Sequence, residues 1–243
     1  MTARIALQPA YVLHGRAYRE SSVLLEIFAR DHGRLGLIAR GARGARSRWK
    51  SVLQPFRPLL LSWTLRGELG TLTGADQVAS PPALAGDLLF CGLYANELLM
   101  RFLQRADPHP GLFEHYGGML AALAGGAAPQ PALRIFEYRL LGAAGFGLQL
   151  EREADSGRSL AADASYLYLP ESGPVRRDPR PGAQTSPVLC SESGEELVSG
   201  AALLALKSGQ PEAEHLAELK VLMRKLIRHH LGGRSIRSQQ LFA

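Results

Sequence analysis

The chain has 243 residues, 46% of them apolar and 21% charged, an ordinary balance that excludes a disordered chain and suits one or two globular domains. Lys and Arg outnumber Asp and Glu by 28 to 22, and residues 1–80 alone hold 12 basic and five acidic residues. All the net positive charge therefore belongs to the first third. A polyanion, either a nucleic acid or a membrane surface, is the natural partner of such a segment.

The two cysteines and the hydropathy pattern indicate the compartment. Cys91 and Cys190 lie about a hundred residues apart and neither has a CxxC partner, so neither a disulfide framework nor a zinc cluster is indicated. No apolar run reaches the roughly 18 residues that a transmembrane helix needs, and the N-terminus lacks the apolar region of a signal peptide. We expect a cytoplasmic protein.

Residues 8–80 have the pattern of short strands. Apolar, β-rich runs are separated by turn signals such as Asp31-His32-Gly33 and Gly67, with almost no helical periodicity. About five short strands in this length fit a small closed barrel such as an OB-fold, and an open antiparallel sheet is the alternative. Trp63 lies in an apolar run, so we expect it in the core.

A basic segment from Arg40 to Lys50 interrupts these strands. It contains no acidic residue, and Gly41 and Gly44 loosen its backbone, so it predicts an exposed loop on a rigid scaffold that suits a phosphate backbone. Trp49 lies between two cations, where an exposed ring would suit base stacking. The alternative is a solvated loop with no partner. The predicted nucleic-acid contacts of the N-terminal domain are Arg34, Arg40, Arg43, Arg46, Arg48, Trp49, Lys50 and Arg57.

The pattern changes to a helical period after Ser80-Pro81-Pro82. We therefore predict an α+β chain: residues 1–80 form a five-stranded barrel, and residues 81–243 form an all-helical domain. An irregular loop at about 151–190 interrupts the helices, although 166–169 could be a short strand. Expected helices span Leu84 to about Asp107, 111–123, about 131–145, 195–206 and 213–231.

The last of these helices is the clearest. One of its faces is apolar, and Lys220, Arg224 and Arg228 recur at four-residue spacing on another. We take these three cations as a second set of nucleic-acid contacts. An ordinary solvated helix face is the alternative, and a membrane-surface helix would require the apolar face to be exposed.

Catalytic patterns are missing from the sequence. It has no HExxH, G-x-S-x-G or Walker sequence, and the seven histidines are scattered. We therefore expect a binding protein and not an enzyme. An OB-fold protein that binds RNA or the ribosome is the alternative function, because charge and a barrel would serve it equally.

Several stretches, in order and spacing, resemble the RecO family of bacterial recombination mediators. They are YVLHGRAYRESSVLLEIFARDHGRLGLIARGAR, LQPFRPLLLSW, GLYANELLMRFL, PALRIFEYRLLGAAGFG and LGGRSIRSQQLF. The resemblance covers nearly the whole length and implies an N-terminal OB-fold followed by a helical domain. It also implies a protein that binds single- and double-stranded DNA, anneals complementary strands, and acts with RecR, and in many bacteria RecF, to help RecA replace single-strand binding protein (SSB).

The resemblance further implies a site for the acidic, Phe-ended tail of SSB on the helical domain. The matching stretch is PALRIFEYRLL, and the residues it assigns are Leu133, Arg134 and Leu140. An acidic tail with a terminal Phe needs a cation beside an apolar pocket. Localisation in the cytoplasm, associated with the nucleoid, follows from the same resemblance.

The chain departs from the family in one respect. Many members carry four cysteines as a zinc site after the turn that corresponds to residues 145–147. Here the loop GLQLEREADSGRSLAADASYLYL contains no cysteine, and Cys190 alone cannot replace four ligands. We therefore predict no metal and no cofactor.

Overall fold

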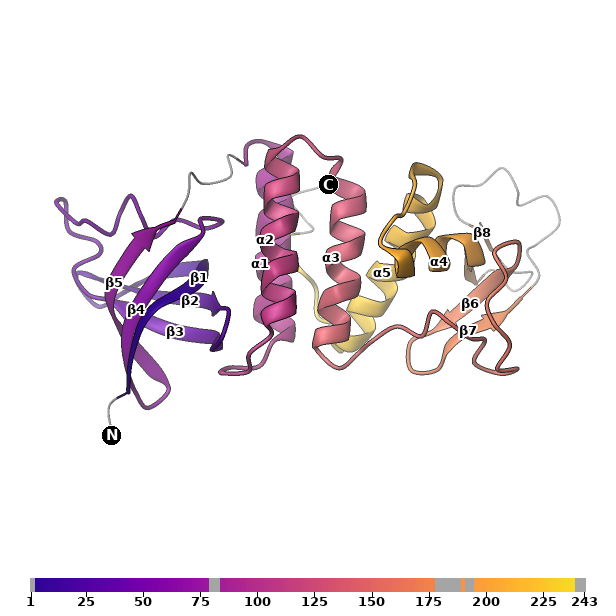
Figure 1. Ribbon diagram of the computed structural model, residues 1–243, viewed down its shortest axis with the longest axis horizontal. Coiled ribbons are helices and arrows are strands. Elements are labelled where there is room, and N and C mark those ends of the chain that lie inside the picture. Colours follow the sequence, from indigo (N-terminus) through magenta and orange to yellow (C-terminus); the bar gives the residue numbers. More distant parts are fainter. Residues whose placement is uncertain (1–2, 79–83, 178–188, 191–194, 239–243) are drawn as a thin grey trace. The chain divides into compact units, whose positions relative to one another are not determined.

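The computed structural model describes residues 3–78, 84–177, 189–190 and 195–238. The chain divides into two compact units, one of residues 1–127 and 236–243 and the other of residues 128–235 (Figure 1). The predicted strand-to-helix boundary at Ser80-Pro81-Pro82 lies outside the described residues.

The first unit begins with the five strands that the sequence predicts, and they close into a barrel in the order β1-β2-β3-β5-β4. Their bounds are Ala3–Tyr18 for β1, Ser22–Ala29 for β2, Gly33–Ala39 for β3, Leu59–Arg66 for β4 and Leu69–Gln77 for β5. The long first strand pairs antiparallel with both β2 and β4, with register shifts between Val12 and His14 and between Ile5 and Gln8. These irregularities bend β1 around the barrel. The parallel pair β3–β5 completes the closure.

Alternate residues of these strands fill the barrel. In β4, Leu59, Leu61 and Trp63 are at most 1% exposed, while the residues between them are half-buried. The prediction that Trp63 belongs to the core is confirmed. Each such side chain stabilises the fold by roughly 1.5–3 kcal/mol through removal of apolar surface from water.

Two helices complete the first unit, α1 over Asp87–Phe102 and α2 over Pro110–Ala124. Tyr11 of β1 contacts the rings of Phe113 and Tyr116 in α2 at centroid distances of 5.1 and 5.0 Å. The buried amide of Asn96 donates to the carbonyl of Leu13 over 2.8 Å. Aromatic packing and this hydrogen bond fix the helices against β1.

The second unit is not all-helical, so that part of the fold prediction was wrong. It holds a four-stranded sheet in the order β7-β6-β9-β8. The bounds are Pro129–Ala143 for α3, Ser165–Leu169 for β6, Gly173–Arg176 for β7, Leu189–Cys190 for β8, Glu196–Ser199 for β9, Gly200–Ser208 for α4, Ala213–His215 for a 3₁₀ turn and Leu216–His230 for α5. The predicted irregular loop at 151–190 thus contains three of the strands.

The junction between β9 and α4 shows why the pattern misled. A helix was predicted from Glu195, but Glu196–Ser199 is a strand in which Val198 pairs with Tyr166. The Oγ of Ser199 accepts a hydrogen bond from the N–H of Ala202 over 3.1 Å, which begins the helix only at Gly200. Partners distant in the chain decided the state of a segment whose local pattern favoured helix.

The helix α5 keeps the two faces that the sequence predicts. Leu219, Met223 and Leu226 are at most 1% exposed, while the basic residues at 220, 224 and 228 are on the exposed side. The apolar side packs in the interior of the second unit, where α5 contacts α3, α4 and β9. Because that side is covered, α5 lacks the exposed apolar face that a membrane-surface helix needs. In the described part of the chain, no helix is both long and apolar enough to span a membrane.

Candidate nucleic-acid interface

The basic loop is Arg40–Lys50, the first part of the connection between β3 and β4, and its ends are anchored on the barrel. Ala42 is 6% exposed and belongs to the barrel core, and Trp49 packs against the same core. The backbone N–H of Arg43 donates to the carbonyl of Ser21 over 2.9 Å, and a succession of tight turns follows. Gly41, with φ +68°, makes the first turn possible.

The cations of this loop face solvent. Arg40, Arg43, Arg46, Arg48 and Lys50 are all exposed. In the described parts of the chain, none of the five forms an ion pair with a carboxylate. Uncompensated charge on an anchored loop is what attraction of a phosphate backbone requires.

Trp49 is half-buried, and its indole serves first as an anchor of the loop. The guanidinium of Arg48 lies over the ring, 4.3 Å from its centroid. A nucleobase that stacked on this face would have to displace Arg48. The prediction of an exposed, open stacking surface is therefore only partly matched by the geometry.

Three of the predicted contact residues use their guanidinium groups within the protein. Arg57 Nη1 donates to the carbonyl of Ser51 over 2.7 Å. Arg43 Nη1 donates to the carbonyls of Arg19 and Glu20, each over 3.1 Å. These bonds position the loop, and the third residue, Arg34, lies in a separate network.

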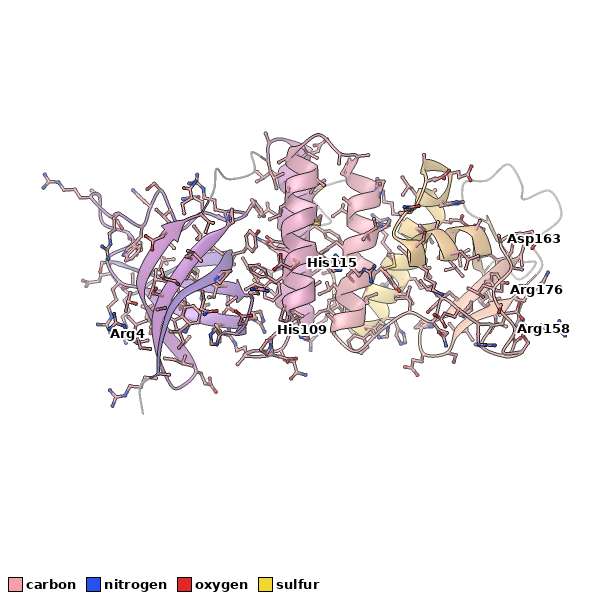
Figure 2. The ribbon with its side chains drawn as sticks, viewed as in Figure 1. Arg4, His109, His115, Arg158, Asp163 and Arg176 are labelled. Carbon is pink, nitrogen blue, oxygen red and sulfur yellow. The ribbon has the colours of Figure 1, made fainter. Side chains whose placement is uncertain are left out.

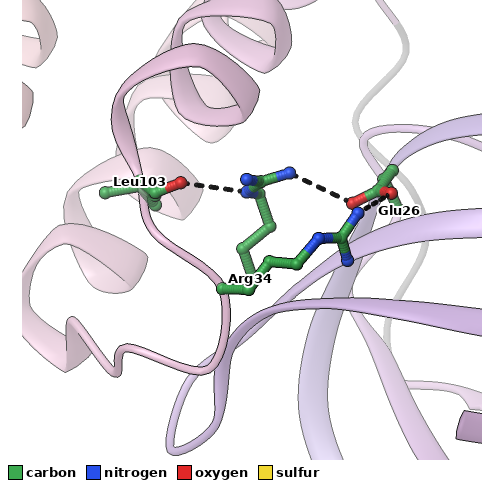
Figure 3. A network of polar contacts seen from close by, with 4 residues as sticks. Glu26, Arg34 and Leu103 are labelled. Carbon is green, nitrogen blue, oxygen red and sulfur yellow. Dashed lines mark hydrogen bonds and ion pairs between the residues drawn. The ribbon is translucent and has the colours of Figure 1, made fainter. Parts of the chain in front are cut away.

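Arg34 joins the barrel to the segment between α1 and α2 (Figure 3). Its Nη1 contacts Glu26 Oε2 over 3.2 Å, and its Nε donates to the carbonyl of Leu103 over 3.1 Å. Arg105 pairs with the other oxygen of the Glu26 carboxylate. Burial lowers the pKa of Arg34, against the opposing effect of Glu26. With 17% of its side chain exposed, Arg34 is placed as a structural cation.

The sequence did not single out Arg19 and Tyr18, at the turn between β1 and β2. Arg19 is exposed, and its guanidinium lies over the Tyr18 ring, 5.3 Å from the centroid. The hydrogen bonds of Arg43 bring this turn to the basic loop. The neighbouring Glu20 gave the segment a mixed charge, so no charge signal marked it.

The second predicted set lies on α5 of the other unit. Lys220, Arg224 and Arg228 are exposed there and recur along one side of the helix. Their neighbour Lys225 instead donates from Nζ to the carbonyl of Tyr168 over 3.2 Å. The stripe is thus a solvent-facing row of cations set by helical periodicity.

The predicted SSB-tail residues lie in the interior. Leu133 and Arg134 are each 4% exposed, and Leu140 is fully buried. Arg134 Nη2 contacts Glu137 Oε1 over 2.8 Å, and the side chain of Glu137 is also fully buried. Among the described residues, Arg134 Nε has no hydrogen-bond partner. The burial of Arg134 keeps a peptide carboxylate from this cation in the structure, and Glu137 already occupies its Nη2.

The histidines do not gather into a metal site. His109 directly precedes α2, at its N-cap position, and His115 lies within the helix (Figure 2). Throughout the described ranges, no three His, Cys, Asp or Glu side chains are arranged to hold a metal ion. In the second unit, exposed groups of both signs project near the sheet, among them Arg158, Asp163 and Arg176 (Figure 2). The described surface around Arg158, Asp163 and Arg176 therefore carries mixed charge, unlike the basic loop.

The fold and the site define the class of the chain: a closed five-stranded barrel with an anchored cationic loop, followed by helices and a second small sheet. Two family models match it, Recombination protein O N terminal over residues 1–81 and Recombination protein O C terminal over residues 84–240. The chain belongs to the RecO family of DNA repair proteins.

Curated relatives of the same name match over nearly their whole length. The DNA repair protein RecO of Methylococcus capsulatus is 45% identical over 243 residues, which cover 99% of this chain and 94% of the relative. RecO of Azoarcus sp. (strain BH72) is 42% identical, with 98% and 95% covered. RecO of Nitrosococcus oceani is 45% identical, with 98% and 93% covered. Membership of the family assigns the chain to DNA repair and recombination.

Proposed function

We propose that the chain binds single- and double-stranded DNA through the basic loop and anneals complementary strands during recombinational repair. The observation that carries the proposal is the row of exposed loop cations on a closed five-stranded barrel, none of which pairs with a carboxylate among the described residues. Two DNA strands repel one another, and a cationic surface that neutralises both lets their bases pair.

The action is one of binding and not of catalysis. In this proposal the chain works with RecR, and where present RecF, to help RecA replace SSB on single-stranded DNA. It acts in the cytoplasm in association with the nucleoid, without a metal or cofactor. Support comes from membership of the RecO family and from the cationic loop.

Binding of the SSB tail at α3 is part of the same proposal. The helix supplies a cation, Arg134, and apolar neighbours in Leu133 and Leu140, but Glu137 holds that cation. The tail carboxylate would take the place of Glu137, an exchange of one carboxylate for another on the same guanidinium.

The decisive assay is annealing of complementary strands already coated with SSB. The wild-type chain should accelerate annealing, and the affinity for single-stranded DNA should fall with salt at a slope of about 0.7 per phosphate contacted. Replacing Arg40, Arg46, Arg48 and Lys50 together by alanine should abolish annealing. Affinity that stays constant from low to moderate salt, or a preference for RNA over a matched DNA strand, would contradict the proposal.

The tail site needs a variant that removes the cation without leaving a buried carboxylate alone. The double variant Arg134→Met/Glu137→Leu meets this condition, since apolar residues can replace a buried ion pair. It should lose affinity for an SSB-tail peptide while it keeps the affinity for bare DNA. Peptide affinity equal to that of the wild type would show that the tail binds elsewhere.

A further inference from the structure

The turn between β1 and β2, residues 19–21, lies at the same end of the barrel as the basic loop. The strand register places it there: Ala17 of β1 pairs with Val23 of β2, and Val23 pairs with Ala39, the last residue of β3. The turn and the start of the loop therefore both come directly after paired positions at the same end of the neighbouring strands β1, β2 and β3. The β4–β5 hairpin starts at the other end of β1, because Leu65 pairs with Ala3.

One residue of the loop fastens the two segments together. Arg43 donates from Nη1 to the carbonyls of Arg19 and Glu20, and from its backbone N–H to the carbonyl of Ser21. Arg19 has φ +53°, a backbone conformation that non-glycine residues seldom adopt. Three successive carbonyls of the turn thus accept hydrogen bonds from a single residue of the loop.

The two joined segments carry the same pair of side chains. Arg19 lies over Tyr18 at 5.3 Å, and Arg48 lies over Trp49 at 4.3 Å. Each pair supplies a cation and an aromatic ring, the two groups by which proteins bind single-stranded nucleic acids. A base that stacked on the covered face of either ring would have to displace the guanidinium, which could then contact a phosphate.

We propose that the β1–β2 turn and the basic loop bind one nucleic-acid strand together, with Arg19 contacting a phosphate, Tyr18 a base, and Arg43 positioning the two segments. This inference rests on the proposed DNA-binding function and adds contact residues to it. Arg43 acts through the carbonyls that it holds and not as a phosphate contact. Its removal leaves the cations in place but lets the turn and the loop separate.

Two probes distinguish the role of the ring from the role of the charge. They are an oligothymidylate and an abasic strand of equal length, which carry the same phosphates with and without bases. Tyr18→Ala should weaken binding of the oligothymidylate about tenfold and leave the abasic strand unaffected, because only the former can stack. Arg19→Ala should weaken binding of both strands and lower the salt slope by about 0.7.

Arg66 supplies the matched control, since it is an exposed arginine at the β4–β5 hairpin. Arg66→Ala should leave both affinities near those of the wild type. Tyr18→Ala and Arg19→Ala variants that behave like Arg66→Ala would overturn the inference. If that happened while the variant with alanine at Arg40, Arg46, Arg48 and Lys50 still lost DNA binding, the proposed function would stand. A wild-type chain that binds neither strand would refute the proposed function itself.

The positioning role of Arg43 has its own readout. Arg43→Ala should weaken binding of the oligothymidylate at an unchanged salt slope, because no phosphate contact is lost. In the wild-type background, we expect the losses of affinity caused by Arg19→Ala and Arg48→Ala to be coupled. In the Arg43→Ala background, the same two losses should be additive. A salt slope lowered by about 0.7 in Arg43→Ala, with the coupling intact, would show instead that Arg43 is a phosphate contact.

Discussion

Two of the three predicted binding places, the basic loop and the SSB-tail stretch of α3, differ in how the structure treats their arginines. In the barrel unit, Arg46 and Arg48 are exposed on an anchored loop. In the second unit, Arg134 is 4% exposed and paired with the fully buried Glu137. Both predictions rely on arginines. Solvent, and hence DNA, can reach those of the basic loop without a rearrangement, whereas Arg134 is buried.

The difference shows that the sequence surroundings of an arginine decide whether it can be buried. A run of cations without acids cannot be buried, because isolated ionised groups lose too much hydration energy in the interior. Such a run therefore has to be on the surface. A single arginine in a helical apolar stripe can be buried when a carboxylate lies one turn away, as Glu137 does.

The largest effect should come from breaking the buried pair of the second unit. Glu137→Ala leaves the Arg134 guanidinium buried without its carboxylate, and we expect a loss of about 3–5 kcal/mol in the free energy of unfolding. Urea unfolding followed by circular dichroism would measure it. The double variant Arg134→Met/Glu137→Leu should recover most of this stability; if it remained as unstable as Glu137→Ala, loss of packing would be the cause.

In the barrel unit, two glycines with the same backbone conformation should respond differently to alanine. Gly33 has φ +66°, and an added Cβ would lie 2.1 Å from the carbonyl oxygen of Asp107. Gly41 has φ +68° with nothing within 4 Å. We expect Gly33→Ala to cost about 3 kcal/mol, from overpacking and backbone strain, and Gly41→Ala only about 1 kcal/mol.

Fluorescence offers a unit-specific measurement of that difference. The only two tryptophans of the sequence, Trp49 and Trp63, both belong to the barrel unit. Thermal unfolding monitored by tryptophan emission therefore reports this unit. Equal losses in the two variants would mean that the approach of Asp107 to Gly33 does not constrain the fold.

The two cationic surfaces can be compared directly by neutralisation. Alanine at Arg40, Arg46, Arg48 and Lys50 should lower the affinity for single-stranded DNA on the order of a hundredfold, through the loss of phosphate contacts. The triple variant of α5, with alanine at 220, 224 and 228, should lower it less, because within the described residues none of these three cations lies over an aromatic ring. Fluorescence anisotropy at several salt concentrations would check both, and a larger loss from the α5 variant would reverse the ranking.

The smallest effect concerns the segment after α5, which returns to α1 of the barrel unit. The Glu97 carboxylate accepts hydrogen bonds from the backbone N–H groups of Arg237 and Ser238 and from Ser238 Oγ, over 2.8–3.0 Å. Burial alone would raise the pKa of Glu97, but these bonds and the one from Arg101 lower it below its ordinary value of 4.5.

The sign of the pH dependence follows from that lowered pKa. The stability from Glu97 is fully present above its unfolded-state pKa and is lost as the pH falls through the folded pKa. Glu97→Gln should therefore reduce the free energy of unfolding at neutral pH by about 1–2 kcal/mol and have little effect in acid. An equal loss at both pH values, measured by urea titration, would assign the effect to packing.

The elements with strong local signals were predictable. The barrel strands are short, β-rich apolar runs bounded by turn signals, and α5 repeats its apolar residues with helical spacing, so each local pattern agrees with the final packing. The second sheet was missed because its strands are short: Gly173–Arg176 has four residues and Leu189–Cys190 has two. A strand of that length has too few residues to show a period, and only its pairing partner defines it.

By itself, the sequence indicated that the first third of this chain consists of short strands, carries all the excess positive charge and holds an acid-free run of cations in one loop. These features follow from local rules: β-rich apolar runs bounded by turn signals form strands, and uncompensated charges cannot enter a core. The tertiary structure alone decided that Arg34 and Arg134 serve internal networks and that Arg43 joins the loop to the β1–β2 turn. Those roles depend on Glu26, Glu137 and the carbonyls of residues 19–21, whose positions are set by folding and not by the pattern of the chain.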